Sequence, residues 1–139
     1  MKARLLLILL LLPATSVTAT PEEARKHFEE GMRLLAAKER GRALEELKRA
    51  IELDEQYLEA HREYQDHVLE ESRNNRQALI AEYRRRLEAH PDSPAFHYLL
   101  GRLLEGRERE SELRRSVELD PSFCDGHMEL AALYRVKNR

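Results

Sequence analysis

ARKHFEEGMRLLAAKERGRALEELKRAIELDEQY, residues 24–57, is the stretch that decides the fold. Its first half carries apolar residues three and four positions apart, as on one face of an α-helix, at Ala24, Phe28, Met32, Leu34 and Leu35. The second half repeats the pattern with Ala43, Leu44, Leu47, Ala50, Ile51 and Leu53. Between them lies a polar segment, 38–41, in which Gly41 is expected to relax the backbone for a turn. Each helix has one apolar face, so the two must fold against each other and then stack on a neighbour.

Related versions of this stretch recur along the chain. The copies cover residues 24–57, 58–93, 94–123 and, cut short, 124–139. The second copy is two residues longer than the first, and we place the extra residues in a turn at 72–75. The third copy is four residues short between Gly101 and Pro121, about one helical turn. We therefore expect its second helix to be short and to begin near Glu108.

The register of the copies resembles the tetratricopeptide repeat, a helix–turn–helix of ~34 residues. Ala43, Leu47 and Ala50 match the small-large-small series of the family's second helix, and Leu100-Gly101 restores its Leu-Gly pair. Gly31 and Ala43 are small enough to let the two helices approach closely. The resemblance implies an all-α, right-handed superhelical stack of about three and a half repeats. It also implies that the first helices line a concave groove that holds a peptide or a helix of a partner.

Residues 1–19 have the three regions of a secretory signal peptide. Lys2 and Arg4 are the positive region, 5–12 is an unbroken apolar run, and Val17-Thr18-Ala19 supplies small residues for cleavage after Ala19. The run is too short for a membrane-spanning helix, which needs ~20 apolar residues. We expect one domain, 20–139, exported to a periplasm or secreted, with no membrane span after cleavage.

The charge of this domain excludes several function classes. Removing Lys2 and Arg4 from the 24 basic residues leaves 22 against 26 acidic ones, a net charge of about −4 that is mixed along the chain. Such a surface does not favour nucleic acid. The run Arg84-Arg85-Arg86 is expected to lie on the surface.

No chemistry in the sequence indicates an enzyme. The chain has no glycine-rich phosphate loop, no HExxH and no GxSxG, and its single cysteine allows no internal disulfide. Cys124 and His127 are half of a zinc site with no second pair. We expect no cofactor, no metal and no catalytic residue.

Four histidines recur in phase, three residues after the start of each copy: His27, His61, His97 and His127. One interpretation is a ladder for metal binding or pH sensing. The other is that each ring fills the bulky slot between the two helices of its repeat, which the match to the repeat register favours.

The candidate partner-binding residues lie on the first helix of each copy, one position beyond the histidines or one helical turn further on, with Arg25 and Leu35 added at the first repeat's end of the groove. They are Arg25, Phe28, Met32, Leu35, Arg62, Asp66, Tyr98, Arg102 and Met128. Aromatic, Met and Arg side chains commonly anchor interfaces. The alternative for Phe28 and Tyr98 is packing between neighbouring repeats.

The terminal helix, 124–139, leaves an apolar face that a further helix would cover in a longer array. That face comprises Leu130, Leu133 and Tyr134. Three explanations stay open: the helix caps the stack with Glu129, Arg135 and Lys137 outward, a second copy covers it in a homodimer, or the reading frame is truncated.

The sequence thus favours a non-catalytic scaffold that binds a protein or peptide in an exported compartment. The alternatives are the recognition part of a larger exported enzyme or redox protein, and a histidine-based metal- or pH-responsive module.

Overall fold

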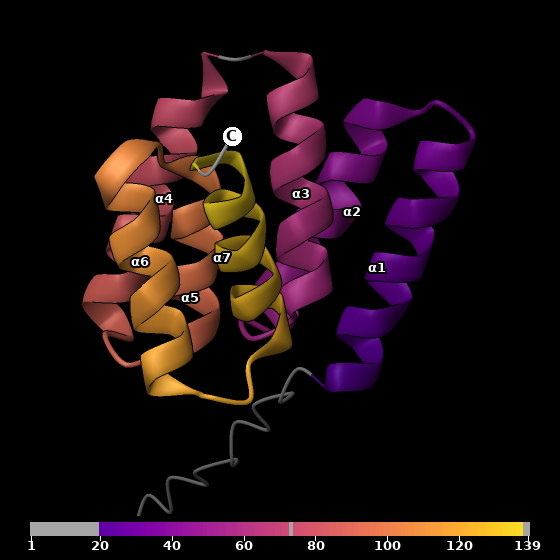
Figure 1. Ribbon diagram of the computed structural model, residues 1–139. Coiled ribbons are helices and arrows are strands. Elements are labelled where there is room, and N and C mark those ends of the chain that lie inside the picture. The colour runs from indigo at the N-terminus through magenta and orange to yellow at the C-terminus, as the bar shows by residue number, and fades with distance from the viewer. Residues whose placement is uncertain (1–19, 73, 138–139) are drawn as a thin grey trace, which may run out of the picture.

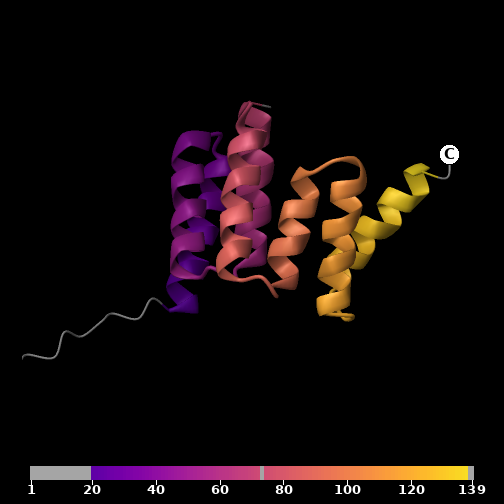
Figure 2. The ribbon, with the colours of Figure 1, turned by 90° about the vertical axis from the view of Figure 1, so that its left-hand side faces the viewer.

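The computed structural model describes residues 20–72 and 74–137, and these residues form seven α-helices and no strand. The helices are α1 (Pro21–Ala36), α2 (Arg40–Leu53), α3 (Leu58–Glu71), α4 (Asn75–Ala89), α5 (Pro94–Leu103), α6 (Gly106–Leu119) and α7 (Cys124–Lys137). Figure 2 shows them following one another in chain order along a stack. The expected all-α helical repeat stack is confirmed. The proposed signal peptide, 1–19, lies outside the described residues.

None of the described helices combines the length and the apolar character needed to cross a bilayer. Among the described helices, α1 and α5 begin at side-chain caps that the local sequence supplies. Thr20 and Glu23 form a capping box at α1, with Pro21 in its first turn. Ser93 Oγ accepts a hydrogen bond of 3.2 Å from the Phe96 amide and so caps α5.

The sequence suggested that Gly41 makes the first turn, and the structure shows otherwise. Gly41 lies inside α2, and the left-handed residue is Lys38, with φ of 63°. Lys38 N–H donates to Leu35 O at 3.0 Å, and Glu39 N–H donates to Leu34 O at 2.9 Å. These bonds satisfy carbonyls at the end of α1, so the close of the helix determines the turn and the glycine is not needed there.

The shortening of the third repeat falls in its first helix and not in its second, so the expectation of a late α6 is wrong. α5 has 10 residues, whereas α6 has 14 and already begins at Gly106. Gly106 has φ of +59°, a conformation that glycine adopts without strain. The chain therefore reverses within Leu104 and Glu105, and α5 loses the helical turn.

Two of the three hairpins close around a glycine. A Cβ added at Gly31 would lie 3.0 Å from Leu47 Cγ, and one added at Gly101 would lie 2.9 Å from Leu113 Cγ. In the second repeat, Gln65 stands at the glycine position and Tyr83 at the leucine position. Both are buried, with 1% and 0% of their surface exposed. Two large side chains thus replace a glycine and a leucine, and Figure 1 shows α3 and α4 standing apart.

The wide second repeat divides the apolar core into two clusters. One joins Ala50, Ile51 and Ala60, with Phe28 and Tyr57 against them. The larger one is built mainly from α4, α5 and α6, with Phe96, Leu99 and Leu113 at 0% exposure. α3 lies between the clusters, and its Tyr64 packs against both.

The glycine contacts give a direct test of this packing. We expect Gly101→Ala to destabilise the protein by about 1 kcal/mol, because the strain of overpacking against Leu113 exceeds the gain in helix propensity. Urea denaturation measures the change. Gly41→Ala is the matched control: nothing lies within 4 Å of the added Cβ, so stability should stay equal or rise by up to about 1 kcal/mol. Equal effects of the two substitutions would contradict the close approach of α5 and α6.

Candidate partner-binding surface

Most of the in-phase histidines form a hydrogen bond to a loop that joins two repeats. In three of them, Nε2–H donates to a backbone carbonyl six residues earlier: His61 to Glu55 O at 3.0 Å, His97 to Pro91 O at 2.9 Å and His127 to Pro121 O at 2.9 Å. The other ring nitrogen faces the second helix of the same repeat in His27, His61 and His97. His27 Nδ1 lies 2.6 Å from Glu46 Oε2, and His97 Nδ1 lies 2.6 Å from Glu112 Oε2.

The expectation that all four rings are buried between helices holds for His61 alone. His61 is 1% exposed, His27 and His97 are partly exposed, and His127 is exposed. Among the residues that the structure describes, no three His, Cys, Asp or Glu side chains come together as a metal would require. The shared position therefore corresponds to a loop contact in His61, His97 and His127, whereas His27 pairs with Glu46.

His61 is the buried centre of the junction network, which we define as Glu55, His61, Tyr83, Arg86 and His90. The Tyr83 hydroxyl donates to His61 Nδ1 at 2.7 Å, which requires the neutral ring with its proton on Nε2. Burial lowers the pKa of His61 from 6.5 to about 4. Burial also raises the pKa of the Tyr83 hydroxyl, so that it stays a proton donor.

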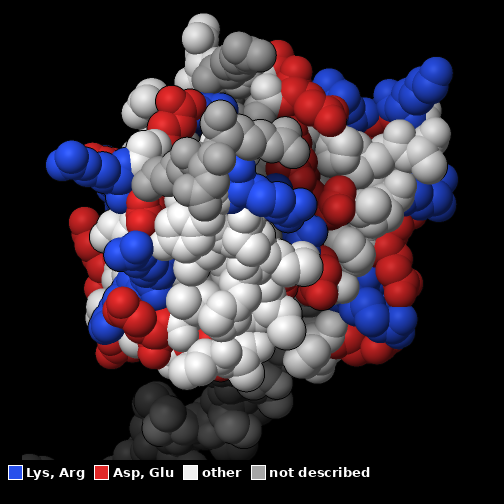
Figure 3. All heavy atoms as spheres, in the orientation of Figure 1, with Lys and Arg blue, Asp and Glu red and all other residues white. Residues whose placement is uncertain are grey.

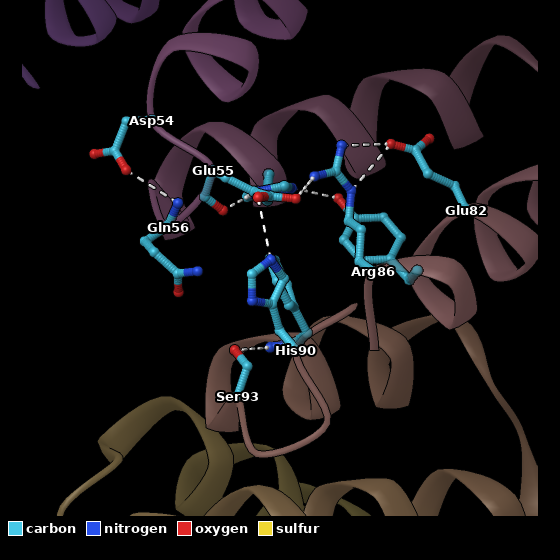
Figure 4. A network of polar contacts seen from close by, with 10 residues as sticks. Asp54, Glu55, Gln56, Glu82, Arg86, His90 and Ser93 are labelled. Carbon is cyan, nitrogen blue, oxygen red and sulfur yellow. Dashed lines mark hydrogen bonds and ion pairs between the residues drawn. The ribbon is translucent and has the colours of Figure 1, made fainter. Parts of the chain in front are cut away.

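Figure 4 shows how Glu55 ties this network to α4. Arg86 Nη1 donates to Glu55 Oε1 at 2.9 Å, and its Nη2 donates to Glu82 Oε1 at 2.9 Å. His90 Nε2 lies 3.3 Å from the other Glu55 oxygen. The Arg86 guanidinium also lies 5.9 Å from the Tyr83 ring centroid. Arg86 is thus partly buried between elements, although the run 84–86 was expected to lie on the surface.

The outward side of the first helices, α1, α3, α5 and α7, is called here the first-helix face. Its central charges pair with one another across repeats. Arg102 Nη2 lies 2.7 Å from Asp66 Oδ1, and Arg62 Nη1 lies 3.0 Å from Asp125 Oδ1. Arg102 also donates to Gln65 Oε1 at 3.0 Å, and Gln65 donates to Leu99 O at 3.0 Å. Three predicted site residues, Arg62, Asp66 and Arg102, therefore belong to one set of inter-repeat contacts.

The apolar candidates on this face divide into exposed and packed side chains. Met128 is 65% exposed and Met32 is 36% exposed. Phe28 is half-buried with its ring 5.0 Å from Tyr57, and Tyr98 is 2% exposed with its ring 5.5 Å from Phe123. Phe28 and Tyr98 thus pack between repeats, the alternative that the sequence left open.

The remaining candidates lie at the edges of the face. Arg25 is exposed and pairs within α1 with Glu22 and Glu29 at 2.8 and 2.7 Å. Leu35 lines a hollow of about 490 Å³ between α1 and α3, together with His67. Asp66 and Leu69 line another of about 650 Å³ at the end of α3. Leu35 and Asp66 thus each border a hollow.

The terminal helix turns its expected apolar residues inward. Leu130 is 8% exposed in the larger core cluster, and Tyr134 packs against the same cluster. The Tyr134 hydroxyl accepts from Arg114 Nε at 2.9 Å and donates to Glu110 Oε1 at 3.1 Å, while Leu133 is half-buried. The exposed side of α7 instead carries Cys124, His127, Met128, Ala131, Arg135 and Val136. Figure 3 shows a largely uncharged area there.

Sequence reasoning missed Gln65 and Arg86. Gln65 could have been found by aligning the copies on their histidines, since a long amide replaces a glycine there. Arg86 carried no such signal, because its partners Glu55 and Glu82 are common surface residues in this sequence.

The helix pairs, the glycine-closed hairpins and the stacked loops define a helical-repeat protein with a tetratricopeptide-like fold. The structure is similar to the solved structure "MamA 41-end from Desulfovibrio magneticus RS-1", with a TM-score of 0.52, 18% sequence identity and coverage of 86% of this chain and 67% of that chain. At this identity the likeness extends to the fold. No protein-family model matches the sequence, and a comparison with curated proteins gives no match.

Proposed function

We propose that the protein is a non-catalytic scaffold that binds a protein or peptide partner on its first-helix face. The observation that carries this proposal is the arrangement of that face, where Met32 and Met128 are exposed while the charges between them are paired. Paired charges offer little net attraction for a free ion. Exposed methionines adapt to apolar partners, and so favour recognition by shape and a few apolar anchors.

Site-specific photo-crosslinking tests the proposal. A benzophenone amino acid placed at Met32 or at Met128 is expected to crosslink the same partner protein in the cells that express the chain. The matched control is Ser111, which is exposed on α6 and away from the first-helix face. Equal crosslinking from all three positions, or crosslinking from Ser111 alone, would contradict the use of this face.

We also propose that the scaffold works after export, in a periplasm or outside the cell. The support is the order of positive, apolar and small residues in 1–19. Mass spectrometry of the purified natural protein is expected to give an N-terminus at Thr20, in a fraction outside the cytoplasm. A natural protein that retains the apolar run 5–12 would contradict cleavage.

A further inference from the structure

The second repeat opens a groove on the side of the stack opposite the first-helix face. Its walls are α2 and α4, its floor is α3, and its volume is about 520 Å³. The floor and inner walls are apolar: Leu44, Tyr64, Val68, Ala78 and Leu79. A second hollow of about 480 Å³ shares Lys48, Tyr64, Glu82 and Arg85 with the first and continues it towards Glu55 and Ala89. We call the two together the α2–α4 groove.

The groove follows from the replacement of the hairpin glycine by Gln65. In the other two hairpins, Gly31 and Gly101 admit a leucine of the second helix, and the two helices touch. Gln65 and Tyr83 fill that place in the second repeat and are held there by hydrogen bonds to Leu99 O and His61. The bulk of the two side chains spaces α4 from α3, and their hydrogen bonds keep them in that position, so the opening is a fixed part of the fold.

The walls select the shape of a guest. The backbone groups of α2, α3 and α4 are hydrogen-bonded within their own helices, so these helices offer an extended strand no backbone donors and acceptors to pair with. A helix needs no such partner, and its side chains can lie in the channel between two helices. Tyr64 and Val68 are four residues apart on the floor, which suits a guest with an apolar stripe of helical spacing. The channel from Leu44 to Glu55 is about three helical turns long.

The charges on the rim select the direction of that guest. Glu45 and Glu71 are exposed at one end, where neither has an ion-pair partner among the described residues. Lys48 and Arg85 are exposed and equally unpartnered further along, where the two hollows overlap. Beyond them, Glu55 and Glu82 are already engaged by Arg86. The free charge of the groove is therefore negative at one end and positive in the middle.

We propose that the α2–α4 groove binds an amphipathic helix of a partner protein, with acidic residues in its first turns and basic residues in its last. Its acidic start lies beside Lys48 and Arg85 and its basic end beside Glu45 and Glu71. The guest then runs antiparallel to α2 and α4, so its helix dipole points opposite to theirs. Acidic residues at the start and basic residues at the end also stabilise the guest helix through its own dipole. This site is separate from the first-helix face.

Two synthetic peptides of 14 residues test this proposal against the full chain. Both carry leucines at helical spacing; the forward peptide has an acidic first turn and a basic last turn, and the reversed peptide exchanges them. Fluorescence anisotropy at low ionic strength is expected to show about tenfold tighter binding of the forward peptide. The double variant Lys48→Glu with Arg85→Glu should abolish this preference, because the rim is then negative at both places. Both residues are exposed, so folding is not at risk.

Two further variants locate the bound peptide. Val68→Glu should weaken the forward peptide at least about tenfold, whereas Met32→Glu on the first-helix face should leave it unchanged. Equal binding of both peptides, binding of neither, or loss of binding in Met32→Glu would overturn the proposal. Light scattering gives a further test. If the chain forms a dimer that Val68→Glu dissociates and the forward peptide does not, the proposal is also overturned, because the groove would then hold a second copy of the chain.

Discussion

Lowering the pH from 6.5 to about 4 is expected to remove roughly 3 kcal/mol of stability through His61 alone. In the unfolded chain the imidazole binds a proton near 6.5, whereas in the folded protein its pKa is about 4. Between these values the proton binds the unfolded state preferentially. The stabilising effect is therefore complete above pH 6.5 and is lost as the pH falls to about 4. Urea denaturation at a series of pH values measures it.

The cause of the low pKa of His61 is the burial of the ring, whose effect is larger than the effects of the neighbouring polar and charged groups. The hydrogen bond to Glu55 O and the carboxylates of Glu82 and Glu55 favour the charged form, and the Arg86 guanidinium opposes it. His61→Gln is the control, because it removes the buried imidazole and leaves the other histidines and the carboxylates in the chain. Its stability should depend less on pH over this range, although it is lower at neutral pH. Identical pH profiles, or an NMR titration of the His61 ring near 6.5, would contradict the prediction.

The sequence predicted the helices well because apolar residues recur at helical spacing in each copy, and α1 and α5 also carry start signals. Thr20 with Glu23 and Ser93 before Pro94 are local patterns, and local patterns determine where a helix begins. The turns were harder. The shortened third repeat could lose a turn from either helix. The turn is lost from α5, because Gly106 adopts a left-handed conformation and α6 begins there.

The candidate surface was less predictable, because groove and core positions adjoin on one helix. Tyr98 and Met128 share a register position, yet Phe123 packs against the first, whereas the second is 65% exposed. Which side is covered depends on the neighbouring repeat, and a single repeat does not encode it. The α2–α4 groove depends on Gln65 and Tyr83. Their effect on the spacing of α3 and α4 can be seen only once the two helices are packed together.

The largest loss of stability among single core substitutions is expected for Phe96→Ala, about 3–5 kcal/mol. Phe96 is 0% exposed and lies on the junction network, with its ring centroid 5.7 Å from those of both His61 and His90. Arg86 approaches the same ring at 6.0 Å. Removing the ring leaves a cavity in the larger core cluster, beside the junction network. Urea denaturation at neutral pH measures the loss.

Phe28→Ala is the matched control, since Phe28 is half-buried and meets the single ring of Tyr57. It should cost less than half as much as Phe96→Ala. The two predictions are also linked, because the cavity at Phe96 admits water to His61. In Phe96→Ala the pKa of His61 should therefore rise from about 4 towards 6.5. An unchanged His61 titration would contradict the prediction, because the His61 ring would then owe its burial to other side chains than Phe96.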